Sequence, residues 1–248
     1  MKKRYLVLVM VLALVLCACG GPAKEEVSGS IQPAATEAAA PEAEISGTVQ
    51  PAETEPAAAE RPVSMGRLEG GIYTNSYTGY GCNLDSSWTY YSAEELQDMP
   101  EAVKEAMEGS ELGDSIDTLN QFTDMMAENV EALTTMNILY QKLSMEERLG
   151  YAMLDEAEVL ELLLEEKDMM VAGYAQAGFE VESMETVTVS FLGRERTALK
   201  TSCTTQGVPY YTLQLFDFAL GQYSVTLTLA SFVEDNTAGM LELFYPVS

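Results

Sequence analysis

Apolar and polar positions alternate in the C-terminal third of the chain, with the period of two that is typical of β-strands. The alternation runs through residues 187–191, 199–203, 211–215 and 223–229, and glycines or Gln-Gly pairs separate these segments. Each segment is long enough for one strand, and the glycines suit tight turns. The pattern therefore predicts an antiparallel meander of about four strands.

A helical period precedes the meander. Apolar residues between Val159 and Tyr174 recur three and four positions apart, and Gly178 follows where a helix would end. Ser144-Met-Glu-Glu147 has the spacing of a capping box, in which the Ser and Glu side chains satisfy free backbone N–H groups. These signals predict a long amphipathic helix that begins after Ser144.

Shorter elements are expected nearer the N-terminus and at the C-terminal end. Residues 71–84 suggest two short strands around a Gly/Asn/Ser turn, and Ser92-Ala-Glu-Glu95 predicts a helix start. Residues 122–127 and 136–143 could pair as strands, although the first segment also fits a helix. A final helix is expected from about Asp235 through Phe244. Residues 67–248 thus form one α+β domain, an antiparallel sheet with segregated helices.

The order of these elements resembles a known family. A Tyr73-Thr-Asn75 hairpin leads to Trp88, and a strand pair, a long helix, a glycine-punctuated meander and a C-terminal helix follow. This order is similar to the PsbP/DcrB/LpqN-like α/β/α sandwich, over most of residues 70–246. The resemblance implies a non-catalytic binding or assembly-accessory module, a domain found in exported bacterial lipoproteins.

The N-terminal end resembles a bacterial lipoprotein signal. Lys2, Lys3 and Arg4 precede an apolar run that is too short for a transmembrane helix. The run ends in Leu16-Cys-Ala-Cys19, which resembles a lipobox, and the small Ala18 favours Cys19 over Cys17 as the acylated residue. The resemblance implies that residues 1–18 are removed and that acylated Cys19 holds the protein on the outer side of a cell membrane.

Residues 19–66 differ in composition from the rest of the chain. Ala, Pro, Glu, Ser and Thr dominate, aromatic residues are absent, and a ten-residue unit that starts at Ser28 recurs eighteen positions later at Ser46. Such a segment cannot bury enough apolar surface to offset its ordering entropy. A disordered linker with a duplicated spacer is therefore expected between Cys19 and the domain.

Charge excludes one class of partner. The chain has 13 Lys and Arg against 39 Asp and Glu, for a net charge of -26. Nucleic-acid binding needs a basic face and is excluded. No EF-hand calcium loop, Walker loop or dinucleotide motif occurs. No metal site and no cofactor are therefore expected.

Catalytic motifs are scarce. The chain has no His, so Ser-His and Cys-His nucleophile pairs are absent. We therefore expect a non-enzymatic module that binds an envelope protein or a small apolar ligand. The alternative is a carboxylate-based envelope hydrolase, which would need two buried Asp or Glu side chains that converge in a pocket.

Two sets of side chains are candidate functional positions within the domain. Cys82 and Cys203 could form a disulfide in an exported compartment, or they could remain buried free thiols, which we favour. Adjacent tyrosines on a strand point to opposite faces, so one ring of each pair must leave the core. The expected binding surface therefore draws on two such pairs, namely Tyr90, Tyr91, Tyr210 and Tyr211.

Overall fold

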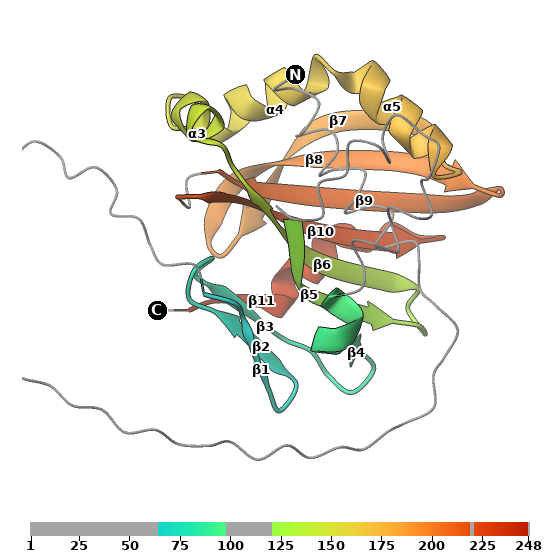
Figure 1. Ribbon diagram of the computed structural model, residues 1–248. Coiled ribbons are helices and arrows are strands. Elements are labelled where there is room, and N and C mark those ends of the chain that lie inside the picture. The colour runs from blue at the N-terminus through green and yellow to red at the C-terminus, as the bar shows by residue number, and fades with distance from the viewer. Residues whose placement is uncertain (1–63, 98–120, 219–220, 248) are drawn as a thin grey trace, which may run out of the picture. The chain divides into compact units, whose positions relative to one another are not determined.

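The computed structural model describes residues 64–97, 121–218 and 221–247 (Figure 1). These residues form helices and two antiparallel sheets, so the predicted α+β class is confirmed. The predicted signal peptide, Cys19 and residues 19–63 of the predicted linker lie outside the described residues. Among the helices of the described part, none combines the length and apolar character needed to cross a membrane.

The larger sheet contains the predicted meander. Its strand order is β4-β5-β6-β10-β9-β8-β7, and every neighbouring pair is antiparallel. The strands are β4 (Thr89–Tyr90), β5 (Gln121–Asn129), β6 (Thr134–Lys142), β7 (Glu180–Phe191), β8 (Arg194–Thr205), β9 (Val208–Asp217) and β10 (Tyr223–Phe232). Leu192-Gly193 and Gln206-Gly207 join consecutive strands with positive φ at both positions, which suits the twist of two-residue hairpins.

The smaller sheet joins the two ends of the described chain. Its order is β1-β2-β3-β11, with β1 at Arg67–Glu69, β2 at Ile72–Asn75, β3 at Tyr80–Asn83 and β11 at Phe244–Pro246. The predicted N-terminal hairpin is β2 and β3. The predicted C-terminal helix is wrong in its second half: α6 (Thr237–Met240) and a 3-10 turn are followed by β11, where Phe244 pairs with Cys82. The backbone of β3 thereby gains a strand partner.

Three helices replace the single long one that the periodicity predicts. They are α3 (Met145–Tyr151), α4 (Glu156–Leu164) and α5 (Lys167–Gln176). The Ser144 capping box is present, and Asp155 forms a second one. The Asp155 carboxylate accepts the Glu158 N–H at 2.9 Å, while Glu158 accepts the Asp155 N–H at 2.9 Å. The predicted long helix is interrupted at this second capping box, because the Asp155 backbone is extended and not helical.

The larger sheet separates two apolar cores (Figure 1). The helix-side core lies between the sheet and helices α4 and α5, and the hairpin-side core lies between the sheet and β2, β3, β11 and α6. Central members of the helix-side core are Val159, Leu163, Met170, Tyr174, Leu199, Tyr210 and Phe216. Central members of the hairpin-side core are Tyr73, Tyr80, Cys82, Ile138, Tyr140, Leu213, Leu227 and Phe244. Each of strands β5 to β10 therefore contributes to both cores through its alternating side chains.

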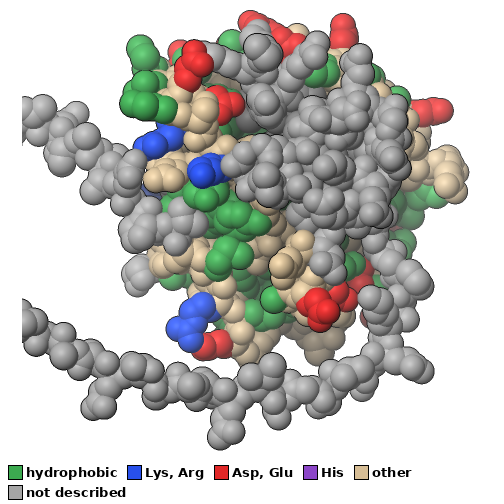
Figure 2. Space-filling model, viewed as in Figure 1, with side chains coloured by type: hydrophobic (Ala, Val, Ile, Leu, Met, Phe, Trp, Pro, Cys, Tyr) green, Lys and Arg blue, Asp and Glu red, His purple; other side chains and the backbone are tan. Residues whose placement is uncertain are grey.

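Helix α3 buries none of its residues. Met145 and Leu149 lie four positions apart on one helical face, and Met153 continues that spacing. All three are exposed, and hydrophobic side chains gather over α3 at the upper left of Figure 2. This helix contrasts with α4, whose Val159, Leu160 and Leu163 are buried.

Candidate functional site

A cleft lies along the edge of the larger sheet, where β4 is short and does not pair with most of β5. Its volume is about 550 Å³. Four structural segments line it: the start of the described chain with β1, strand β2, the β4–helix segment at residues 90–97, and β5. The lining side chains that matter below are Met65, Leu68, Tyr73, Tyr90, Tyr91, Leu96, Phe122, Asp124, Met125 and Met126. We call this cavity the β5-edge cleft.

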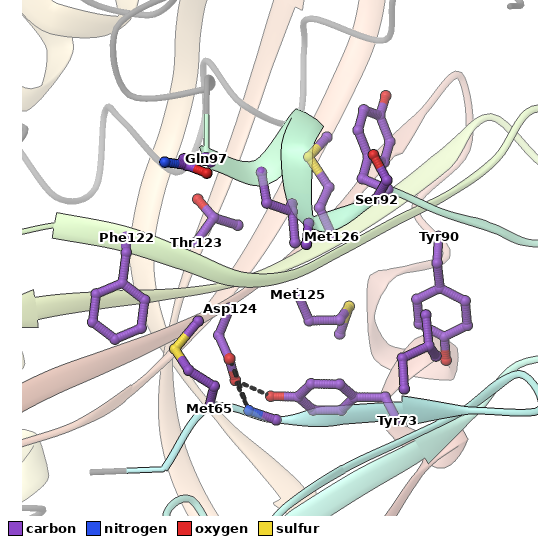
Figure 3. A pocket seen from close by; sticks show the side chains of 15 residues that line it. Met65, Tyr73, Tyr90, Ser92, Gln97, Phe122, Thr123, Asp124, Met125 and Met126 are labelled. Carbon is purple, nitrogen blue, oxygen red and sulfur yellow. Dashed lines mark hydrogen bonds between the residues drawn. The ribbon is translucent and has the colours of Figure 1, made fainter. Parts of the chain in front are cut away.

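The side chains that line the cleft lie on both sides of strand β5, and we call these two sides the lobes of the cleft (Figure 3). Thr123 and Met126 point to one side of the strand, whereas Phe122, Asp124 and Met125 point to the other. Asp124 and Met125 share a side because the β5–β6 register shifts between Thr123 and Met125, which leaves Asp124 as the extra residue of a β-bulge. The bulge therefore turns a carboxylate into the lobe on the hairpin side.

The Asp124 carboxylate is buried in a network of neutral donors. The Tyr73 hydroxyl donates to Asp124 Oδ2 at 2.5 Å, and Asn75 Nδ2 donates to the same oxygen at 2.6 Å. The Gly66 N–H donates to Oδ1 at 2.8 Å. Asn75 Nδ2 also lies 2.8 Å from the Tyr140 hydroxyl oxygen. The network thus links β2 of the smaller sheet to β5 and β6 of the larger one.

Burial controls the protonation of this network. Desolvation raises the pKa of Asp124, although the hydrogen bonds from Tyr73, Gly66 and Asn75 act in the opposite direction. Desolvation, with the Asp124 charge as a second cause, also raises the pKa of Tyr73 and of Tyr140. Both phenols therefore stay protonated, and the Tyr73 hydroxyl remains a donor to the carboxylate.

Gly66 lies where a side chain would not fit. A Cβ on this residue would overlap the Tyr73 ring, with the ring Cζ 2.6 Å away. The ring cannot move freely, because its hydroxyl is bonded to Asp124 and its side chain is buried. Gly66 therefore lets the chain pass close to Tyr73 and present its N–H to the carboxylate.

We expect Gly66→Ala to lower the free energy of unfolding by about 2 kcal/mol, because Tyr73 must leave its rotamer or its hydrogen bond. The matched control is Gly150→Ala in α3, where an added Cβ meets nothing within 4 Å. That change should stabilise the protein by about 0.5–1 kcal/mol through helix propensity. Urea unfolding of both variants measures whether each substitution lowers or raises the free energy of unfolding. Equal changes in the two variants would contradict the close approach of Gly66 to Tyr73.

The structure places the four tyrosines that were predicted to form a binding surface in different environments. Tyr90 and Tyr91 both line the β5-edge cleft, and their rings contribute to opposite lobes, since Tyr90 packs on the hairpin-side core and Tyr91 on the helix-side core. Tyr210 is fully buried, so its assignment to a surface is wrong. Tyr211, partly exposed on β9, is not among the residues described as lining the cleft.

The two domain cysteines are free and buried. Cys82 lies in the hairpin-side core and Cys203 in the helix-side core, so the larger sheet stands between them and the disulfide is not formed. Burial raises the pKa of the Cys82 thiol to about 11 and that of Cys203 to about 12. Both thiols therefore pack as small apolar side chains.

The sequence reasoning missed Asp124, Asn75 and Gly66. One signal was available, because Asp124 is an acid in the middle of the apolar run from Phe122 to Ala127. An acid at such a position is expected to have hydrogen-bond partners. Within the described ranges, no cluster of three or more His, Cys, Asp or Glu side chains could hold a metal ion.

A second polar cluster lies on the opposite part of the larger sheet. Arg196 of β8 donates from Nε to Glu156 at 2.9 Å and from Nη2 to Asp217 at 3.0 Å. A shallower cavity of about 290 Å³ borders this cluster. Burial raises the pKa of Asp217, and the Arg196 charge opposes that rise. Both acids share one guanidinium, which ties α4 to β8 and β9.

Comparisons with known proteins show a distant likeness to solved structures. No family model matches the sequence, and no curated protein matches it. The solution structure of cyanobacterial PsbP (CyanoP) from Synechocystis sp. PCC 6803 is similar over 77% of this chain and 98% of that chain, with 9% sequence identity and a TM-score of 0.38. A likeness at this TM-score carries no argument about function, which must rest on the cleft itself.

Proposed function

We propose that the domain is a non-catalytic binding module that takes a small, largely apolar ligand in the β5-edge cleft. The observation that carries this proposal is the lining of the cleft, where aromatic, Met and Leu side chains lie beside the part of β5 that does not pair with β4. Ligand sites in proteins are typically concave and apolar with few polar groups. The two lobes suit an elongated ligand that crosses the edge of the strand.

The lining disfavours the hydrolase alternative. A carboxylate-based hydrolase needs two acids at a set separation, one to protonate and one to attack or activate water. Asp124 is the sole acid among the described residues that line the cleft. Its oxygens already accept hydrogen bonds from Gly66, Tyr73 and Asn75. Glu156 and Asp217, a second pair of acids, are both paired with Arg196.

The binding test uses a neutral, solvent-sensitive naphthalene dye, whose emission shifts to the blue in an apolar site. Leu68 lines the cleft and is 48% exposed. Leu68→Glu is expected to weaken dye binding about tenfold, because binding would then desolvate a carboxylate. The control is Leu149→Glu on α3, which has a similar exposure of 61% and lies away from the cleft. Equal weakening by both variants, or no dye binding, would contradict the proposal.

We further propose that acylated Cys19 tethers this module to the outer face of a cell membrane, which the lipobox resemblance supports. Cys19→Ala should move the protein from the membrane fraction to the soluble fraction, whereas Cys17→Ala should not. Membrane retention of the Cys19 variant would refute the anchor.

A further inference from the structure

We infer that the ligand of the β5-edge cleft is an organic cation, an ammonium group on an apolar body, with its charge beside Asp124. This inference rests on the proposed binding function and names the chemical class of the ligand. It starts from an imbalance of charge in the cleft. Asp124 is an acid with 8% exposure, and no Lys or Arg is among the described residues that line the cavity.

Hydrogen bonding and charge compensation are separate requirements at Asp124. Gly66, Tyr73 and Asn75 satisfy the hydrogen-bonding capacity of the carboxylate, but all three donors are neutral. A buried carboxylate without a cation is costly, because neutral dipoles replace only part of the solvation that water supplied. The raised pKa of Asp124 has the same cause. A ligand with a positive charge in this lobe would supply the missing counter-ion.

Several aromatic rings line the same side of the cleft as Asp124. In Figure 3, Tyr73, Phe122 and Tyr90 lie on the side of β5 to which Asp124 points. The faces of aromatic rings attract ammonium groups, and rings that enclose a cation can replace its water shell. A carboxylate among several aromatic side chains is therefore chemically suited to an alkylammonium or arylalkylammonium group. The Met and Leu side chains of the lining would contact the apolar body.

The net charge of the whole chain also favours a cationic ligand. A net charge of -26 attracts cations toward the domain and repels anions. The field of the net charge does not favour one surface acid over another as the place where a cation binds. Asp124 differs from the exposed acids because its charge is buried, so its interaction with a bound cation should be screened much less by salt. The salt dependence therefore separates a cation held in the cleft from one attracted to the surface.

The test compares three probes with nearly the same carbon skeleton and different charges: 4-phenylbutylammonium, 4-phenylbutan-1-ol and 4-phenylbutanoate. Affinities are measured by calorimetry on the full chain. Carbon-13 methyl spectra of Met65, Met125 and Met126, which lie in the lining, report the site. We expect the ammonium to bind about tenfold more tightly than the alcohol, and the carboxylate to bind most weakly.

The outcomes separate the two proposals. If the alcohol binds as tightly as the ammonium and perturbs the same methyl groups, the cleft binds apolar ligands but the inference of a cation is wrong. If no probe perturbs the three methionines, the proposed binding function fails together with this inference. A preference for the ammonium that disappears in about 0.5 M salt would indicate surface attraction and would also overturn the inference.

Two variants test whether the Asp124 side chain causes the preference for the ammonium probe. Asp124→Asn should reduce ammonium affinity about fivefold or more and change alcohol affinity less than about twofold. The control is Glu131→Gln, which removes the same charge from an exposed turn between β5 and β6. If both variants weaken ammonium binding equally, Asp124 does not hold the cation. If Asp124→Asn does not fold, the salt dependence in the unaltered chain decides.

Discussion

Asn75→Asp should lower the free energy of unfolding by about 3–5 kcal/mol at pH 7, although it changes a single side-chain group. Asn75 Nδ2 donates to Asp124 Oδ2 at 2.6 Å and also lies near the Tyr73 and Tyr140 hydroxyls. An Asp at this position would replace a donor with a second carboxylate inside a buried site. Two acids in such contact repel, and an unpaired buried charge is costly.

The loss of stability expected in Asn75→Asp should be smaller at low pH. The new pair would have a raised pKa in the folded state, because burial and mutual repulsion both favour the protonated form. A raised acid pKa means that stability is highest below the unfolded value near 4 and falls as pH rises through the folded value. Urea unfolding of the variant between pH 4 and 8 should therefore show stability that decreases with pH more steeply than in the parent protein.

Asn83→Asp provides the matched control. Asn83 is exposed on β3, so the same substitution there should change stability by less than about 0.5 kcal/mol. A loss of similar size at both positions would show that added negative charge, and not the buried network, destabilises the protein. A small, pH-independent effect at Asn75 would contradict the arrangement around Asp124.

Arg196→Met should lower the free energy of unfolding by about 2–4 kcal/mol. Arg196 Nη2 lies 2.7 Å from Glu156 Oε1 and 3.0 Å from Asp217 Oδ1, and it donates to the Phe216 carbonyl oxygen at 3.0 Å. The three charged side chains are only 20–25% exposed. Removing the guanidinium would leave two partly buried carboxylates without their cation and would release α4 from β8.

The control lies two residues away on the same strand. Arg194 is exposed, and Arg194→Met should change stability by less than about 0.5 kcal/mol. Denaturant midpoints of the two variants are compared at pH 7 and at pH 4. The stability loss in Arg196→Met should be smaller at pH 4, since burial raises the pKa of Asp217 and a protonated Asp217 needs no counter-ion. Equal midpoints for the two variants would show that Arg196 makes no net contribution.

Local elements were the most predictable part of the fold. The Ser144 capping box, the β2–β3 hairpin and the four-stranded meander follow from contacts a few residues apart, and the structure contains all of them. The Asp155 box was equally visible in the sequence, but the apolar periodicity on both sides hid the break between α3 and α4. Phe244 was misassigned because its strand partner, Cys82, is far away in sequence.

Only part of the proposed binding site was predicted from the sequence, for a physical reason. Tyr90 and Tyr91 were found because adjacent strand residues must face opposite sides, and both line the cleft. In the second pair Tyr210 is buried in the helix-side core and Tyr211 is partly exposed, and neither residue lines the cleft. Asp124 was missed because a β-bulge, which depends on the register with β6, decides where that carboxylate points.

The sequence by itself determined the α+β class and the strong negative charge, since composition and short periodicities depend on no distant contact. The same sequence supports the prediction that nucleic acid is not a partner. It also supports the prediction of an acylated Cys19. Only the tertiary structure decided that the two cysteines lie in different cores and that β5 has a cleft along its edge. It alone placed Asp124 among Tyr73, Asn75 and Gly66. These features depend on strand order and register, which join residues about fifty positions or more apart.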